Sequence, residues 1–188
     1  MFLLHRPSDR QIQSFLSAQQ HSSFSYSPAE LTRSSPPAGY SVDHNRIQLG
    51  SGAETFSAAV SAIQQWKMFD FGWVHLHSNQ TPIEPRATVA VVVNHLGFWS
   101  INACRIVYVI DEDDRYGFAY GTLAEHAERG EERFMVERNR ADDTVWYDLL
   151  AMSKPGPMAR LAYPFTRKLQ KRFAQQSMQA MKRATAQP

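Results

Sequence analysis

The sequence predicts an α+β fold in which a curved antiparallel β-meander grips a long C-terminal helix, with an additional helix before the sheet. Apolar residues first recur at helical spacing, up to about residue 72. Six runs rich in β-branched or aromatic residues follow up to residue 152, and a second helical stripe comes after Pro164. Because short polar turns separate the six runs, successive strands should pair antiparallel.

The composition favours one globular domain over residues 1–188. The chain has 43% hydrophobic and 12% aromatic residues, enough for a core without disulfide bridges. Within this domain, residues 1–39 should form an N-terminal helix and a Ser/Pro-rich connection, and residues 40–188 the helix-grip-like core. The aromatic excess is compatible with a small-molecule pocket but does not require one.

The N-terminal region predicts a short amphipathic helix over residues 8–18, capped by Ser8 and burying Ile12 and Phe15. The Ser- and Pro-rich residues 22–39 then form a surface connection. Residues 40–49 alternate in polarity around a turn-prone Asp-His-Asn triplet, which indicates either a strand or a tight hairpin.

A longer helix should begin at Ser51. Ser51 and Glu54 have the spacing of a capping box, in which each side chain binds a free backbone amide at the start of the helix. The buried stripe continues until Gly72 breaks the pattern and consists of Phe56, Val60, Ile63, Trp66 and Phe69.

The six expected strands are Phe71–Leu76, Thr88–Val93, Ser100–Ile110, Tyr116–His126, Glu131–Arg138 and Thr144–Met152. The turn at residues 127–130 should contain Gly130 at positive φ. The final helix should begin at Pro164 and reach about Ala184. Its apolar stripe should consist of Leu161, Phe165, Leu169 and Phe173.

Charge is distributed unevenly. From Leu149 onward there are eight Lys/Arg and no Asp or Glu, which leaves twelve Lys/Arg against eighteen acids before it. The basic helix has no recognised nucleic-acid-binding motif and the rest of the chain is acidic, so no nucleic-acid partner is expected.

The cysteine content and the lengths of the apolar runs indicate the cellular compartment. Cys104 is the only cysteine, and no Cys/His group has the spacing of a zinc site, so we expect a reducing compartment, no metal and no cofactor. The apolar run at the N-terminus is too short for a signal peptide. No run in the sequence approaches the roughly 18–20 apolar residues of a membrane-spanning helix. A cytoplasmic protein without a transmembrane segment is the prediction.

Charged residues inside predicted strands are the first candidate site residues. Arg105 lies between apolar neighbours and Asp148 between Trp146 and Leu150. The two could pair across the sheet as structural residues, or Arg105 could face outward or into a cavity. On the last helix, Arg172 falls within the apolar stripe and either extends to water or reaches an anionic ligand.

The stretch 117-GFAYGTLAEHAERGEERF-134 is best interpreted as a hairpin with a charged, solvated end. The alternative is a metal or acid–base site formed by His126 with Glu128, Glu131 or Glu132, although this spacing matches no metal motif.

Four segments, 104-CRIVYVIDED-113, 117-GFAYGTLAEHAERGEERF-134, 145-VWYDLLAMSKP-155 and 160-RLAYPFTRKLQKRF-173, resemble the uncharacterised protein family 0548. The order of elements is similar to the helix-grip architecture of the START/Bet v 1-like superfamily. The resemblance implies a fold and no established activity.

Three functions remain open. The first is a module that binds a hydrophobic or amphipathic small molecule between the sheet and the C-terminal helix. Its ligand-binding candidates are Arg105, Tyr108, Phe118, Tyr120, Phe134, Trp146, Tyr147 and Arg172. The second is a hydrolase, cyclase or isomerase in the same cavity, with His126 or Glu137 as the base and Tyr120 or Arg105 stabilising an anion. The third is an interaction protein with a filled core and a basic docking helix.

Overall fold

The computed structural model describes residues 1–77, 81–95, 97–126, 128–156 and 163–186. Its helices are α1 (Asp9–Gln19), α2 (Gly52–Gln64) and α3 (Tyr163–Thr185), with two short 3-10 helices, η1 (Leu31–Arg33) and η2 (Lys67–Phe69). The strands are β1 (Phe2–Leu3), β2 (Ser41–Ser51), β3 (Val74–His77), β4 (Thr88–His95), β5 (Phe98–Asp111), β6 (Arg115–Thr122), β7 (Glu128–Arg138) and β8 (Thr144–Pro155).

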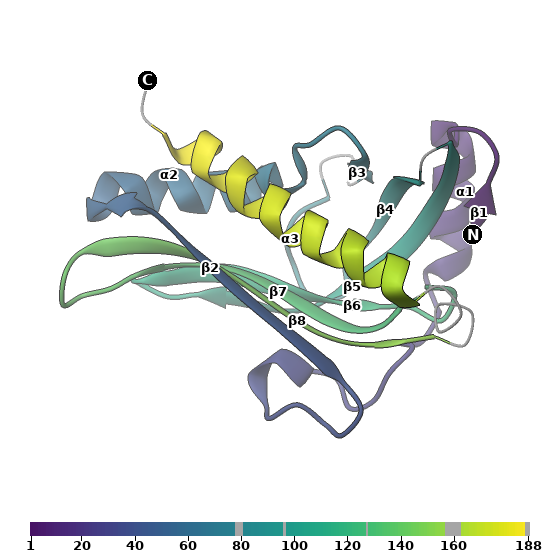
Figure 1. Ribbon diagram of the computed structural model, residues 1–188, viewed down its shortest axis with the longest axis horizontal. Coiled ribbons are helices and arrows are strands. Elements are labelled where there is room, and N and C mark those ends of the chain that lie inside the picture. The colour runs from purple at the N-terminus through teal and green to yellow at the C-terminus, as the bar shows by residue number, and fades with distance from the viewer. Residues whose placement is uncertain (78–80, 96, 127, 157–162, 187–188) are drawn as a thin grey trace.

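Within the described residues, the eight strands form one antiparallel sheet. Seven of them follow the order β2-β8-β7-β6-β5-β4-β3, and β1 pairs with β5. From β4 to β8 each strand pairs with the next in sequence, because the turns between them are short. The sheet curls, with α2 and α3 across one side of it (Figure 1). This arrangement confirms the predicted fold class.

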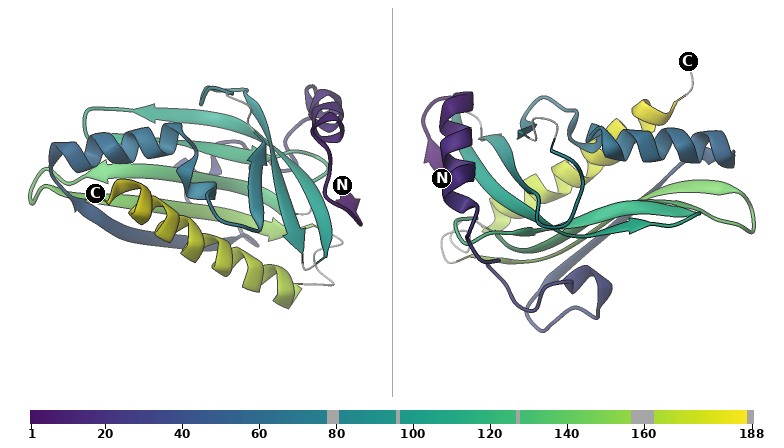
Figure 2. Two further views of the ribbon diagram at one scale, coloured as in Figure 1. Left: turned by 90° about the horizontal axis from the view of Figure 1, so that it is seen from above. Right: turned by 180° about the vertical axis from the view of Figure 1, so that it is seen from behind.

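The two faces of the sheet are covered by different parts of the chain. The face that packs against α2 and α3, here called the inner face, contributes the fully buried Phe118, Phe134 and Tyr147 to the main core. On the other face, here called the outer face, α1 packs against β4 and β5. The segment 22–40, here called the strap, also lies against this face, with Leu31 fully buried (Figure 2). Burying each large apolar side chain stabilises the fold by about 1.5–3 kcal/mol.

The predicted N-terminal helix is confirmed, and Ser8 and Gln11 form its capping box. The start predicted for α2 is also correct, but its capping box is not: the Ser51 side chain makes no capping bond. Ser51 is the last residue of β2, and its carbonyl oxygen accepts a bond from the Thr55 hydroxyl. The helix also ends earlier than Gly72, because Trp66 takes a left-handed conformation at φ 58°.

Of the two alternatives for residues 40–49, the strand is confirmed, because β2 (Ser41–Ser51) pairs with β8 along its length. Two further expectations are corrected. The turn after β6 includes residues 123–126, before the predicted 127–130, because the His126 amide bonds to the carbonyl oxygen of Leu123. Gly130 lies inside β7, where an added Cβ would collide with the backbone of Met152. Leu161, predicted in the last stripe, lies outside the described residues.

Candidate functional site

The inner face changes from apolar to polar between two adjacent rows of side chains. One row, across β6, β7 and β8, consists of Phe118, Phe134 and Leu149. The next row, from β6 through β7 and β8 to β2, consists of Tyr120, Glu132, Ala151 and Asp43. Paired residues of antiparallel strands point to the same side of a sheet. Glu132 and Asp43 therefore bring two carboxyl groups onto the face that α3 crosses.

Aromatic rings fill the apolar side of this boundary. The Phe69 ring lies 5.5 Å from Phe134 and 5.6 Å from Phe173, measured between centroids. The Tyr120 ring lies 5.2 Å from Phe134 in an edge-to-face contact. Tyr120 thus packs its ring in the aromatic cluster and carries its hydroxyl group to the polar side.

Glu132 is the central polar residue of the boundary. Its Oε2 accepts a hydrogen bond of 2.8 Å from the Tyr120 hydroxyl group. Burial, with a smaller contribution from the Asp43 charge, raises the pKa of Glu132 to about 7, although the bond from Tyr120 acts in the opposite direction. The Tyr120 phenol stays protonated, because burial raises its pKa well above 10. The pair therefore holds one carboxyl group that changes charge near neutral pH beside a permanent hydrogen-bond donor.

The N-terminal half of α3 supplies the opposite wall. The Arg167 guanidinium donates a hydrogen bond of 2.7 Å to Asp43 Oδ1 and a second bond to Oδ2 of the same carboxylate. Gln170 hydrogen-bonds to Glu128, whose pKa is raised by burial. These contacts join α3 to β2 and β7 at the polar side of the boundary.

The apolar stripe of α3 is packed unevenly along the helix. Ala180 and Met181, near its C-terminal end, are buried against the core. Phe165 remains 42% exposed, and Leu169 and Phe173 are only partly buried. The N-terminal half of the helix, which carries Arg167 and Gln170, therefore keeps apolar surface exposed to solvent.

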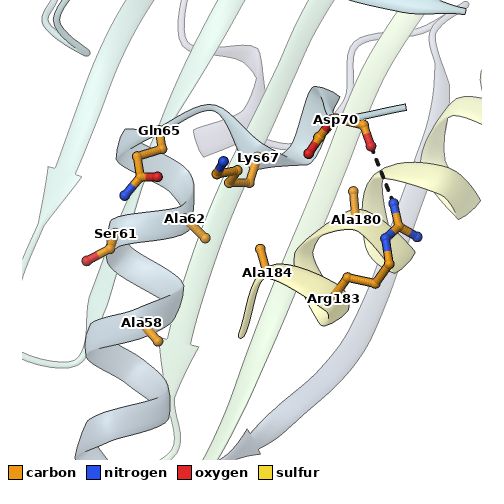
Figure 3. A pocket seen from close by; sticks show the side chains of 9 residues that line it. All are labelled: Ala58, Ser61, Ala62, Gln65, Lys67, Asp70, Ala180, Arg183 and Ala184. Carbon is orange, nitrogen blue, oxygen red and sulfur yellow. Dashed lines mark hydrogen bonds between the residues drawn. The ribbon is translucent and has the colours of Figure 1, made fainter. Parts of the chain in front are cut away.

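Two hollows lie at the surface beside η2. One, of about 380 Å³, lies between α2 and α3, where Ala58 and Ala62 face Ala180 and Ala184 (Figure 3). Arg183 bonds to the carbonyl oxygen of Asp70 at its edge, 3.3 Å away. The other, of about 330 Å³, is lined by residues of the η2 region together with His75 and Leu76.

Four of the predicted ligand-binding residues lie on the inner face: Phe118, Tyr120, Phe134 and Tyr147. The Tyr147 hydroxyl group is 2.8 Å from the Ser177 hydroxyl group of α3, and both residues are fully buried. Tyr147 therefore ties the sheet to the helix, whereas Tyr120 borders the polar region. Ligand contact by these four residues stays a prediction.

Three others lie on the outer face and cannot line a space between the sheet and α3. The Arg105 guanidinium donates to the carbonyl oxygens of Gln19, Gln20 and Ser22, and so holds the end of α1. The Tyr108 hydroxyl group is 2.7 Å from Thr32 Oγ1 in the strap. Trp146 lies beneath the Arg46 guanidinium.

The expected pairing of Arg105 with Asp148 does not occur. Asp148 instead accepts from Arg133 at 2.8 Å, and it lies 3.2 Å from Arg46 and 2.7 Å from His44. All these partners lie near Asp148 on β2 and β7, the two strands that flank β8. The predicted partner is therefore wrong, and Asp148 is paired instead with cationic or ring nitrogens of the neighbouring strands.

The remaining candidates have other contacts than the Tyr120–Glu132 pair. Arg172 is exposed and lies over the Trp73 ring, with 4.7 Å to the ring centroid, so it does not enter the sheet's concavity. Glu137 pairs with Arg46 on the outer face, which removes it as a base in an inner-face cavity. His126 accepts a bond at Nδ1 from the Glu128 amide, and burial lowers its pKa to about 4, so it is neutral near pH 7.

The sequence predicts Glu132 at a charged hairpin end, or as a partner of His126 in a metal or acid–base site, and does not predict its pairing with Tyr120. Its position two residues before Phe134 in a strand was the available signal, since that spacing predicts the same face. The pairing of Arg167 with Asp43 has no local sequence signal, because the two residues are 124 positions apart. Across the described ranges, no group of three or more His, Cys, Asp or Glu is placed to hold a metal ion, and no helix is long and apolar enough to cross a membrane.

Solved structures share this architecture at low sequence identity. A hypothetical protein of Helicobacter pylori has a TM-score of 0.55 and 12% identity, with 78% of this chain and 88% of that chain covered. The di-domain ARO/CYC StfQ from the steffimycin biosynthetic pathway has a TM-score of 0.53 and 9% identity, covering 78% of this chain and 50% of that one. Ara h 8.0201 has a TM-score of 0.50 and 13% identity, covering 76% and 98%. These neighbours show a helix-grip, Bet v 1-like fold.

Sequence relatives cover nearly the whole chain. A UPF0548 protein of Dictyostelium discoideum is 35% identical over 206 residues, which is 98% of this chain and 95% of the relative. A UPF0548 protein of Deinococcus radiodurans is 34% identical over 197 residues and covers 98% of both. A family model described as a domain of unknown function, DUF1990, matches residues 25–180. The chain therefore belongs to the UPF0548 family and carries its DUF1990 domain.

Proposed function

We propose that this protein binds a small hydrophobic or amphipathic molecule between the inner face of the sheet and the N-terminal half of α3. The observation that carries the proposal is the boundary at Tyr120, where an aromatic cluster meets the Glu132 carboxyl group on one face. Small-molecule sites in proteins commonly combine apolar walls with a few polar groups that orient the ligand.

The incomplete packing of α3 supports the same location. Leu169 and Phe173 keep partly exposed surface beside the polar row, and a ligand there would cover apolar area now in contact with water. The likeness to helix-grip structures agrees with a binding module, as an argument from fold alone.

Native mass spectrometry of the purified protein, compared with its mass under denaturing conditions, tests whether a molecule is retained. A neutral fluorescent probe, N-phenyl-1-naphthylamine, then reports the site directly. Leu169→Trp should obstruct the proposed site and weaken probe binding, whereas Lys168→Trp, on the exposed side of the same helix, should leave probe binding unchanged. Equal probe affinity in the two variants, with circular dichroism confirming that both are folded, would contradict the proposed location.

A second candidate function is acid–base catalysis on the bound molecule, with Glu132 in the role first considered for His126 or Glu137. The specific observation in its favour is a pKa of about 7 next to the Tyr120 hydroxyl group, which suits proton transfer at neutral pH. If a molecule is released from the protein, incubating it with enzyme in deuterium oxide tests this function. Deuterium uptake that Glu132→Gln abolishes would support catalysis, and no uptake with the wild type would exclude this proton transfer for that molecule.

A further inference from the structure

The charges around the Tyr120–Glu132 pair are unbalanced. Three carboxyl groups face this region from β2 and β7: Asp43, Glu128 and Glu132. Among the residues that the structure describes, Arg167 is the cation that faces them from α3, and both of its terminal nitrogens already bond to Asp43. An anionic head group entering here would meet two further carboxyl groups and a guanidinium that is already paired.

Other basic residues of this helix point elsewhere. Lys168 and Lys171 are exposed to solvent, and Arg172 lies against Trp73. Within the described part of the chain, the hydrogen-bond partner of Glu132 is the Tyr120 hydroxyl group, and no cation lies within ion-pair distance of it. Glu132 is partly exposed, so the residue is not sealed from solvent.

We propose that the ligand of this site is an amphipathic amine, whose ammonium group pairs with Glu132 while its apolar part lies against the partly exposed Leu169 and Phe173 of α3. The inference rests on the proposed function and specifies the head group of its ligand. An ammonium group supplies the counter-charge that Glu132 lacks, and Tyr120 orients the carboxylate that receives it. A carboxylate ligand would instead have to displace Asp43 from Arg167.

The pairing requires Glu132 to be ionised, so amine binding should strengthen as the pH rises. Among the described residues, the titratable and charged groups near the pair are Asp43 from β2, Cys104 from β5, Tyr120 from β6, Glu128 from β7, Tyr147 from β8 and Arg167 from α3. His126, which bonds to the Glu128 amide, is neutral above about pH 5.5 because burial lowers its pKa to about 4. Burial raises the pKa of the Cys104 thiol and of both phenols, which stay neutral below about pH 8. The two groups left to gain charge are Glu132 and Glu128, and both changes favour a cation.

Displacement of N-phenyl-1-naphthylamine by decylamine, decanoate and decan-1-ol tests this inference, because the three compounds differ only in the head group. At about pH 8, decylamine should displace the probe at concentrations about tenfold lower than decanoate. Glu132→Gln should weaken the binding of decylamine about tenfold and leave the binding of decan-1-ol unchanged. Glu137→Gln removes one carboxylate charge from the outer face of the same strand and should change the affinity for neither compound.

The outcomes separate the two proposals. Decanoate displacing the probe as well as decylamine, or decylamine binding equally well to Glu132→Gln, would overturn the amine inference while the binding site stands. Binding of decylamine that does not strengthen between about pH 5.5 and pH 8 would also overturn it. Failure of the probe and of all three compounds to bind would refute the inner-face site, and the amine inference with it.

Discussion

Replacing Glu131 by alanine should release the strap from the outer face. The carboxylate is 3% exposed and accepts hydrogen bonds from the Tyr26 hydroxyl group at 2.8 Å, the Leu31 amide at 3.2 Å and the Thr32 amide at 3.1 Å. The Thr32 hydroxyl group donates a further bond to it. One side chain thus satisfies two buried backbone amides in a segment about 100 residues away in sequence.

The magnitude follows from the donors left without a partner. Each buried amide that loses its acceptor costs about 1–3 kcal/mol, and removing the buried carboxylate relieves part of its own desolvation cost. Glu131→Ala should therefore lower the free energy of unfolding by about 2–4 kcal/mol. Glu137→Ala breaks a half-exposed ion pair with Arg46 and should cost less than about 1 kcal/mol.

Urea denaturation measures both variants, and hydrogen exchange at the Leu31 and Thr32 amides shows whether the strap has detached. Exchange matters because the strap could open locally before the sheet unfolds, which would reduce the change seen in urea. A Glu131→Ala protein with a loss below about 1 kcal/mol and unchanged protection at both amides would refute this account of how the strap is held.

Three further predictions follow from contacts described above. Arg105→Ala should lower the free energy of unfolding, measured in urea, by about 1.5–3 kcal/mol, because it leaves the carbonyl oxygens at the end of α1 without their donor. Arg105→Lys should restore less than half of this loss. An Arg105→Ala protein as stable as the wild type would show that α1 is held by its apolar face alone. Tyr147→Phe and Ser177→Ala should each cost about 1 kcal/mol, and a double-mutant cycle should give a coupling of similar size; additive losses would contradict a hydrogen bond between them. For Glu132, the folded pKa of about 7 lies above its ordinary value of 4.5, so folding favours the protonated form. The wild type should therefore lose about 1–3 kcal/mol relative to Glu132→Gln as the pH rises from about 4.5 to about 7, and parallel pH profiles of the two proteins would contradict the raised pKa.

The helices, the meander and the family resemblance could be predicted from the sequence, because spacing and turn length are local properties. The faces of the strands could not. Both faces of this sheet are covered, one by α2 and α3 and the other by α1 and the strap, so Tyr108 and Trp146 look as apolar as residues of the inner face.

Within β5, alternation itself fails. The pairing with β6 shifts between Ile106 and Tyr108, so these two residues, two positions apart, point to opposite faces. The face of the sheet to which Arg105 points likewise follows only from its carbonyl partners at the end of α1. The candidate site depends on the same long-range information, since Asp43, Glu132 and Arg167 come together from three distant parts of the chain.

The pairing of β2 with β8 sets an order for folding on the ribosome. Ser41 pairs with Ser153 and Ser51 with Thr144, so β2 has no partner strand until about one hundred more residues have been synthesised. The hairpins from β4 to β8 form between neighbours and can assemble as they emerge, whereas β2 must wait with its backbone groups unpaired. We therefore expect nascent chains that end before β8 to leave residues 41–51 sensitive to protease, and chains that expose β8 beyond the exit tunnel to protect them.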